Sequence, residues 1–300
     1  MKIFALVAIF SGWLAQSFAQ TPMPLYPGNI PNSKPAPSLY REGLNQWRCV
    51  TNVSIPTLTP FLLKDGSTHT AVLVIPGGGY SGVAMGHEGD SIARAFNKIG
   101  VSAFVLKYRL PNDSTMVDKT VGPLQDAQSA LLMIRKNANK WNINPAKVGV
   151  MGFSAGGHLA STLGTHFDKP TIKNNDNISL RPDFMALIYP VITFGKFAHI
   201  GSRENLIGKK PSQQLIDFYS NEKQVTDVTP PTFLVHCEDD NVVPVQNTLM
   251  FYDALLQNKV KGEMHIYTGG GHGFGLHNPT THDYWFDRLK EWMDTNGWLK

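Results

Sequence analysis

Residues Val148–Ala160 read VGVMGFSAGGHLA. The apolar run Val148–Met151 is typical of a buried strand, and the small residues from Ala155 onward favour a helix. Between them lies GFSAG, a G-x-S-x-G pattern centred on Ser154. A serine on a sharp strand-to-helix turn is held in a strained conformation, and glycines two positions to either side let strand and helix approach. We therefore predict that Ser154 lies on such a turn as a candidate nucleophile.

Apolar runs and amphipathic segments alternate along most of the chain. Alternation of strands and helices through one core predicts an α/β fold, a mostly parallel sheet with helices on both faces. The predicted strands are Cys49–Ile55, Leu58–Leu63, Ala71–Ile75, Val101–Leu106, Val148–Met151, Phe184–Tyr189, Phe233–His236 and Met264–Tyr267. The predicted helices are Asp90–Ile99, Val121–Lys140, Ala155–Gly164, Gln246–Gln257 and His282–Asn296.

One long segment, residues 193–231, interrupts this alternation. It holds two short helical patterns, Arg203–Ile207 and Ser212–Tyr219, and it follows a predicted strand. Its length predicts a small cap insertion over the carboxyl edge of the sheet. No internal repeat divides the chain, so residues 41–300 are predicted to form one catalytic domain.

The N-terminus has the pattern of an export signal. Lys2 precedes the apolar run Ile3–Leu14, and small residues follow at Ser17 and Ala19. This predicts a signal peptide over residues 1–19, cleaved after Ala19, and hence a secreted or periplasmic protein with no membrane anchor. Residues 20–40 are rich in proline and are predicted to form an extended strap without ladder hydrogen bonds.

Composition limits the remaining classes of function. The 300 residues carry a formal net charge of +4 without a cluster of Lys or Arg, which gives little support to nucleic-acid binding. Two cysteines cannot build a disulfide scaffold or a four-thiolate zinc site. We predict no metal and no cofactor, and the oligomeric state is left open.

A second glycine-rich turn, PGGGY over residues 76–80, directly follows a predicted strand. Bare glycine amides are suited to stabilising a tetrahedral oxyanion. We assign this role to the backbone N–H groups of Gly78 or Gly79 and of Ala155, the residue after the candidate nucleophile. A phosphate cradle is the competing interpretation, but neither Gly-Lys-Ser/Thr nor G-x-G-x-x-G is present.

An acid and a base follow Ser154 in chain order. Asp239 and Asp240 lie just after a predicted strand, and either can supply the acid. His272 lies in a glycine-flanked loop after the last strand, where it is free to reach Ser154. Serine needs a neutral imidazole to take its proton and a carboxylate to orient that imidazole. The order Ser, Asp, His is that of the α/β-hydrolase triad.

Four segments together carry a specific resemblance: the stretch VGVMGFSAGGHLA, the turn PGGGY, the segment DDNVVP and the loop GGGHGFG. They resemble the BD-FAE-like carbohydrate esterases of the α/β-hydrolase superfamily, over about Ala71 to the C-terminus. The resemblance implies hydrolysis of acetyl, and sometimes feruloyl, esters on plant polysaccharide without a metal, and it selects Asp240 as the acid. Pro76 departs from the histidine that many superfamily esterases have before the three glycines.

Other residues are interpreted from position alone. Three are predicted to border the substrate: Tyr80, His87 and Tyr189. Asp126 and Arg135 on the long helix are predicted to be solvated or capping, and His158 to be a hydrogen-bonded core histidine.

Four alternatives to an acetyl esterase remain. A feruloyl or general carboxylesterase and a peptidase of the prolyl-oligopeptidase kind use the same triad, although the cap segment shows no Glu-Glu pair for a substrate amine. A sugar-binding module without catalysis is disfavoured by the Ser154 and His272 pair. A metal-dependent deacetylase would use His236, Asp239, Asp240 and His265.

Overall fold

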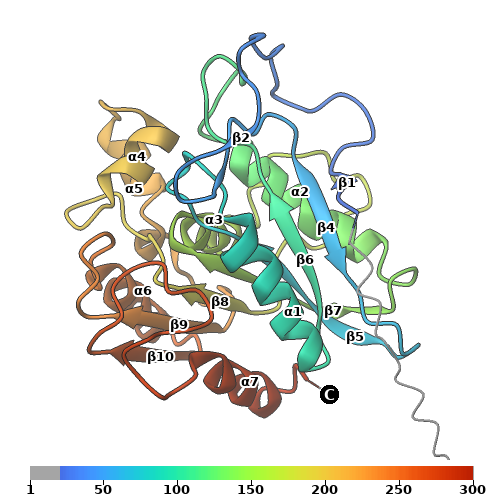
Figure 1. The fold of residues 1–300 in the computed structure, drawn as a ribbon, viewed down its shortest axis with the longest axis vertical. Helices are drawn as coiled ribbons and strands as arrows, with labels where there is room; N and C mark the ends of the chain where they lie inside the picture. Colours follow the sequence, from blue (N-terminus) through green and yellow to red (C-terminus); the bar gives the residue numbers. More distant parts are fainter. Residues whose placement is uncertain (1–20, 300) are drawn as a thin grey trace, which may run out of the picture.

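The computed structural model describes residues 21–299, which form an eight-stranded sheet with helices on both faces (Figure 1). The spatial order is β1-β4-β6-β5-β7-β8-β9-β10. The six strands β5 to β10 pair in parallel, and β4 pairs antiparallel with β6 on one side and with β1 on the other. The strands are β1 (Met23–Pro24), β4 (Thr57–Phe61), β5 (His69–Ile75), β6 (Ser102–Lys107), β7 (Ile143–Phe153), β8 (Met185–Ile188), β9 (Thr232–Cys237) and β10 (Gly262–Tyr267). A separate two-stranded ladder joins β2 (Gly43–Leu44) and β3 (Val50–Thr51).

The helices divide between the two faces of the sheet. Side chains of α2, α3 and α6 share one buried cluster, and side chains of α1 and α7 share the other. The helical segments are η1 (a π-helix, Met85–Asp90), α1 (Ser91–Lys98), α2 (Gly122–Lys136), α3 (Ser154–Thr165), α4 (Ile200–Ile207), α5 (Gln213–Phe218), η2 (a 3-10 helix, Asn221–Gln224), α6 (Gln246–Gln257) and α7 (Trp285–Thr295).

The continuous apolar strands follow from burial on both faces. Along β5, Leu73 and Ile75 pack against the cluster with α2, α3 and α6. Val72 and Val74 point the other way and pack with α1 and α7. Because side chains alternate across a strand, a sheet covered on both sides needs apolar residues at every position.

Several boundaries differ from those predicted. The strand predicted over Cys49–Ile55 is reduced to β3, and the helix predicted over Val121–Lys140 ends at Lys136. The proline-rich strap does carry ladder bonds, because β1 pairs antiparallel with β4 and covers the edge of the sheet. The predicted signal peptide lies outside the described residues. Within residues 21–299 no helix is long and apolar enough to cross a membrane.

Two polar residues of α2 are buried rather than solvated. Asp126 lies fully buried in an ion pair with Arg109, with 2.7 Å between Oδ1 and Nη2. Arg135 likewise pairs with Asp183 at 2.9 Å. The prediction for both residues was wrong, because their partners come from other segments and helical spacing does not reveal them. His158, by contrast, is confirmed as a buried, hydrogen-bonded histidine.

Candidate active site

The turn between β7 and α3 has the strained geometry expected of a G-x-S-x-G sequence. Ser154 is the first residue of α3 and has a φ of +50°. A Cβ on Gly152 would lie 2.2 Å from the carbonyl oxygen of Gly156, and a Cβ on Gly156 would lie 2.2 Å from that of Ile75. Both positions therefore require glycine. A non-glycine residue in this left-handed region costs about 1–3 kcal/mol, which the surrounding structure must offset.

The structure brings Ser154, His272 and Asp240 into one hydrogen-bond chain. The Nε2 atom of His272 lies 2.8 Å from Oγ of Ser154, and its Nδ1 lies 2.6 Å from Oδ2 of Asp240. Because the carboxylate can only accept at Nδ1, the imidazole carries its proton there and accepts the serine proton at Nε2. The Asp240 side chain is fully buried, whereas that of His272 is 16% exposed. This geometry can deliver a serine oxygen as a nucleophile.

Asp240 is held by three further partners. Its Oδ1 accepts the backbone N–H groups of Val242 and Val243, at 2.9 and 2.8 Å. His236, buried behind it, lies 3.2 Å from Oδ2 through Nε2. Burial alone would raise the pKa of the Asp240 carboxyl, but its hydrogen bonds with His236 and His272 hold that pKa well below the usual range. The carboxylate is thus ionised wherever the imidazole can act as a base.

Asp239, the other acid that the sequence left open, has a different position. Its carboxylate accepts the backbone N–H groups of Gly271, at 2.8 Å, and Gly270, at 3.3 Å. Asp239 therefore anchors the loop that carries His272 without contacting the imidazole through a hydrogen bond.

The PGGGY turn lies directly beside the candidate nucleophile. A Cβ on Gly77 would stand 2.8 Å from Cβ of Ser154. The Gly77 amide is already used, since it donates to Oε2 of Glu88 at 2.7 Å. Among the described residues, the amides of Gly78 and Gly79 have no acceptor, and the first-turn amide of Ala155 has none within its helix. These amides are available to an oxyanion.

Two of the residues predicted to border the substrate are buried instead. Tyr80 is 2% exposed, and its hydroxyl bonds Nδ1 of His158 at 2.9 Å. Tyr189 is 0% exposed and lies beneath His272, with ring centroids 4.9 Å apart. The predictions that Tyr80 and Tyr189 border the substrate are therefore corrected, because a position after a strand end does not show that the side chain is buried. His87 is 53% exposed and stays a candidate.

Two residues at the site were missed from the sequence. Glu88 lies buried in η1 below the glycine turn. His199 belongs to the segment between β8 and β9, and its Cε1 lies 3.7 Å from where a Cβ on Gly79 would stand. Burial and the nearby His272 lower the pKa of His199, so its imidazole is neutral. Neither has a motif around it, because Glu88 lies in a π-helix and His199 lies in an irregular insertion.

That insertion lies against the glycine turn. Asn205 on α4 donates its side-chain amide to the carbonyl oxygen of Gly79 at 2.8 Å. His199 caps the N-terminus of α4, and its Nδ1 accepts the N–H of Ser202, which leaves the proton on Nε2. The insertion thus supplies one neutral imidazole donor near the reacting groups.

The residues of the metal-dependent alternative do not gather around one point. Asp239 bonds glycine amides, and His265 bonds Oε1 of Glu263 at 2.8 Å. Only His236 and Asp240 lie together. Over residues 21–299 no three His, Cys, Asp or Glu side chains are placed to hold a metal ion.

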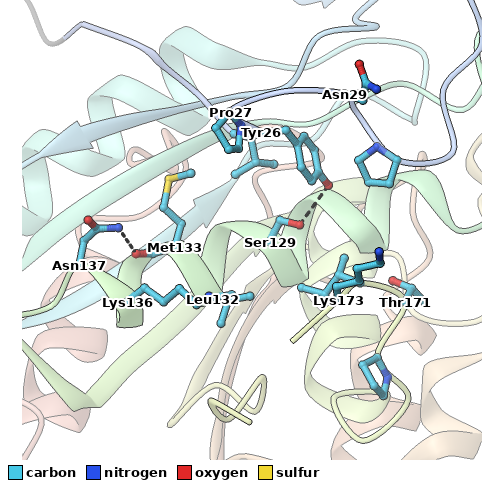
Figure 2. A pocket seen from close by; sticks show the side chains of 14 residues that line it. Tyr26, Pro27, Asn29, Ser129, Leu132, Met133, Lys136, Asn137, Thr171 and Lys173 are labelled. Carbon is cyan, nitrogen blue, oxygen red and sulfur yellow. Dashed lines mark hydrogen bonds between the residues drawn. The ribbon is translucent and has the colours of Figure 1, made fainter. Parts of the chain in front are cut away.

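A groove of about 900 Å³ lies elsewhere, between the N-terminal strap, α2 and the loop after α3 (Figure 2). Tyr26, Ser129, Lys136 and Thr171 are among its lining residues. The Ser129 hydroxyl donates to that of Tyr26, as the figure shows. None of the predicted site residues lines this groove, so its size does not make it the candidate active site.

Comparison with a solved structure identifies the class of protein to which this fold belongs. The fold matches the structure of an acetyl ester-xyloside bifunctional hydrolase from Caldicellulosiruptor lactoaceticus, with 38% identity, a TM-score of 0.82 and coverage of 94% of this chain and 98% of that one. Together with the mostly parallel sheet and the strained serine turn, this match defines the chain as an α/β-hydrolase.

The particular family follows from the sequence comparisons. The model of the family described as BD-FAE matches residues 62–255, and the chain belongs to that family. It is 36% identical to an acetylxylan esterase of Xylanibacter ruminicola over 79% of this chain and 47% of the relative. It is 41% identical to endo-1,4-beta-xylanase B of Butyrivibrio fibrisolvens over 77% of this chain and 36% of the relative. The chain therefore spans less than half of the length of either relative.

Proposed function

We propose that this protein is a serine esterase that removes short acyl groups, acetyl foremost, from plant polysaccharides such as xylan. The observation that carries the proposal is the hydrogen-bond chain from Ser154 through His272 to Asp240, next to unbonded backbone amides. Relatives named as an acetylxylan esterase and an acetyl ester-xyloside hydrolase support the acetyl group and the sugar.

The first half of the proposed reaction is acylation. His272 takes the Ser154 proton at Nε2 while Oγ forms a bond to the ester carbonyl carbon. The carbonyl oxygen becomes an oxyanion that accepts from the amides of Ala155 and of Gly78 or Gly79. The bond to the sugar oxygen then breaks, and His272 returns its proton to that oxygen. The sugar hydroxyl leaves, and the acyl group remains on Ser154.

Deacylation repeats these steps with water. His272 takes a proton from the water, whose oxygen bonds to the acyl carbon, and the same amides hold the second oxyanion. Collapse releases the carboxylic acid and returns the proton to Ser154. Asp240 stays ionised throughout and stabilises the imidazolium. Removing one oxyanion donor typically costs about 10²–10³ in rate, so the amides contribute on the scale of the base itself.

The place of action is proposed from the N-terminus. Lys2, the apolar run and the small residues up to Ala19 support export, with cleavage after Ala19. A polysaccharide substrate is consistent with a secreted or periplasmic enzyme, since such polymers do not cross membranes. Expression of the full chain in a bacterium, fractionation and N-terminal sequencing test this. A mature chain beginning at Gln20 is expected, and an intact N-terminus in the cytoplasm would contradict export.

The test of substrate class is a panel of natural esters. Purified protein is incubated with acetylated xylan, acetylated mannan, acetylated pectin and feruloylated oligosaccharides, and acetate and ferulate are measured. Acetate release, fastest from xylan and absent with Ser154→Ala, is expected. Ferulate release alone would favour a feruloyl esterase, and cleavage of proline-linked amides without acetate release would favour the peptidase alternative.

A further inference from the structure

Glu88 links two loops that both contribute to the candidate active site. It is 3% exposed, in η1, and each carboxylate oxygen meets a different donor. Oε2 accepts the backbone N–H of Gly77 at 2.7 Å, and Oε1 accepts the hydroxyl of Tyr189 at 2.8 Å. The Nε2 atom of His87 lies 3.7 Å from Oε1 at the surface.

Tyr189 continues this link to the loop that carries His272. Its hydroxyl accepts the backbone N–H of Gly275 at 3.0 Å. Its ring lies against His272 and against Phe274, with centroid distances of 4.9 and 4.6 Å. Burial and the Glu88 carboxylate raise the pKa of this hydroxyl, so it keeps its proton and donates. Tyr189 also has a φ of +36°, a strained conformation that its contacts must hold in place.

We propose that Glu88 is a positioning residue, which fixes the glycine turn and, through Tyr189, the histidine loop in register with Ser154. The proposal rests on the function proposed above. A carboxylate suits this place because both neighbours are donors, and only a carboxylate offers an acceptor to each. Glutamine has one acceptor oxygen; if this oxygen accepts the Gly77 N–H, the glutamine NH2 group faces the Tyr189 hydroxyl, which then loses the acceptor for its own proton.

The geometry makes activity sensitive to this link. Gly77 approaches Ser154 so closely that a Cβ would meet the Cβ of the serine at 2.8 Å. A shift of the turn therefore moves the amides of Gly78 and Gly79 relative to Oγ of Ser154. Oxyanion donors act over a narrow distance range, so a misplacement of this kind lowers the rate of the chemical step more than substrate binding.

The experiment uses Glu88→Gln, Tyr189→Phe and the double variant. Hydrolysis of p-nitrophenyl acetate gives kcat and KM, and inhibition by an arylboronic acid reports the oxyanion site, because the boronate forms a tetrahedral anion on serine. Each single variant is expected to lower kcat about 10- to 100-fold and to weaken boronate inhibition by a similar factor, with KM changed less than about threefold. The double variant is expected to be no slower than the slower single variant, since both break one link.

Tyr26→Phe is the matched control. Its hydroxyl also donates to a buried carboxylate, that of Asp126 at 2.9 Å, but in the strap rather than at the site. We expect kcat and boronate inhibition to stay within about twofold in this variant. If Glu88→Gln does not fold, Tyr189→Phe alone decides the question, because it removes a single oxygen.

Two outcomes would overturn the inference without touching the proposed function. One is Glu88→Gln and Tyr189→Phe with lowered melting temperatures but unchanged kcat and boronate inhibition. The other is a double variant whose losses in kcat multiply. Full activity in Ser154→Ala would instead overturn the proposed function itself, so the two failures are distinguishable.

Discussion

The Oγ atom of Ser154 and the Nε2 atom of His272 lie 2.8 Å apart, although 118 positions separate them in the chain. The serine begins α3 after β7, and the histidine follows β10, the outermost strand on one side of the sheet. The carboxyl ends of parallel strands lie along the same border of the sheet, so residues distant in sequence meet there. The first prediction is that Ser154→Ala lowers turnover by about 10⁴–10⁶-fold, leaving only the contribution of the amides and of binding. Acetate release and a circular dichroism spectrum like that of the wild type check it.

Mutations of the adjacent residues Asp239 and Asp240 are expected to lower kcat by clearly different amounts. Asp240→Asn is expected to lower kcat about 10³–10⁴-fold, because an amide facing Nδ1 favours the wrong imidazole tautomer. Asp239→Asn is expected to cost less than about tenfold, since one amide oxygen still accepts from Gly271. Steady-state kinetics on p-nitrophenyl acetate measure both changes. Equal losses would show that anchoring of the histidine loop matters as much as the bond to the imidazole.

The two glycines of the oxyanion turn also differ. A Cβ on Gly78 would lie 2.3 Å from the carbonyl oxygen of Gly82, so Gly78→Ala must displace the backbone. A Cβ on Gly79 would lie no closer than 3.7 Å to its nearest neighbours, His199 and Ser81, and only the φ of +64° opposes alanine. We expect Gly78→Ala to lower kcat more than about 10²-fold and Gly79→Ala less than about tenfold. The reverse order, measured on the same ester, would contradict the geometry of the turn.

The buried ion pair between Arg109 and Asp126 is expected to contribute to stability rather than catalysis. Asp126→Ala leaves the guanidinium of Arg109 buried without its carboxylate, although Arg109 keeps its bond to the carbonyl oxygen of Pro31. Urea unfolding is expected to show a loss of about 3–5 kcal/mol. Below its unfolding midpoint the variant should keep wild-type kcat. A loss under about 1 kcal/mol would mean that water reaches the pair.

Acidification is expected to destabilise the fold through His158. Burial lowers the pKa of His158 to about 4, although the hydrogen bond between Nε2 and the carbonyl oxygen of Tyr219 acts to raise that pKa. An unfolded histidine has a pKa near 6.5, so between about pH 6.5 and 4 the unfolded chain binds one more proton. The free energy of unfolding therefore decreases as the pH is lowered from about 6.5 to 4, by about 3 kcal/mol in total for this group. His166, with a pKa also lowered to about 4, adds to the effect.

Urea unfolding at pH 7.5, 6.5, 5.5 and 4.5 measures this dependence. A free energy of unfolding that stays level from pH 6.5 to 4.5 would contradict a neutral, buried His158.

The predictable parts of the structure are those that depend on the local sequence pattern. Apolar runs gave the strands of the parallel sheet, and the glycines around Ser154 indicated a turn that backbone contacts now explain. Asp239 and Asp240 could not be separated by position, because neighbouring residues share a loop and only coordinates show which carboxylate reaches His272.

The parts that were missed depend on contacts between distant segments. Tyr80 and Tyr189 follow strand ends, yet both side chains are buried and their hydroxyls bond His158 and Glu88. Glu88 lies in a π-helix, whose spacing matches no amphipathic pattern. Arg135 and Asp183 are 48 positions apart, so the sequence of the helix alone does not predict their ion pair.

The most direct test of the account is covalent labelling of the nucleophile. The protein is treated with a fluorophosphonate, digested and examined by mass spectrometry, while residual acetate release is followed in parallel. One phosphonyl group on Ser154 is expected, with activity lost in proportion to labelling and with slower labelling in Asp240→Asn. Full activity after complete labelling of Ser154, or a label on another residue that tracks the loss of activity, would contradict it.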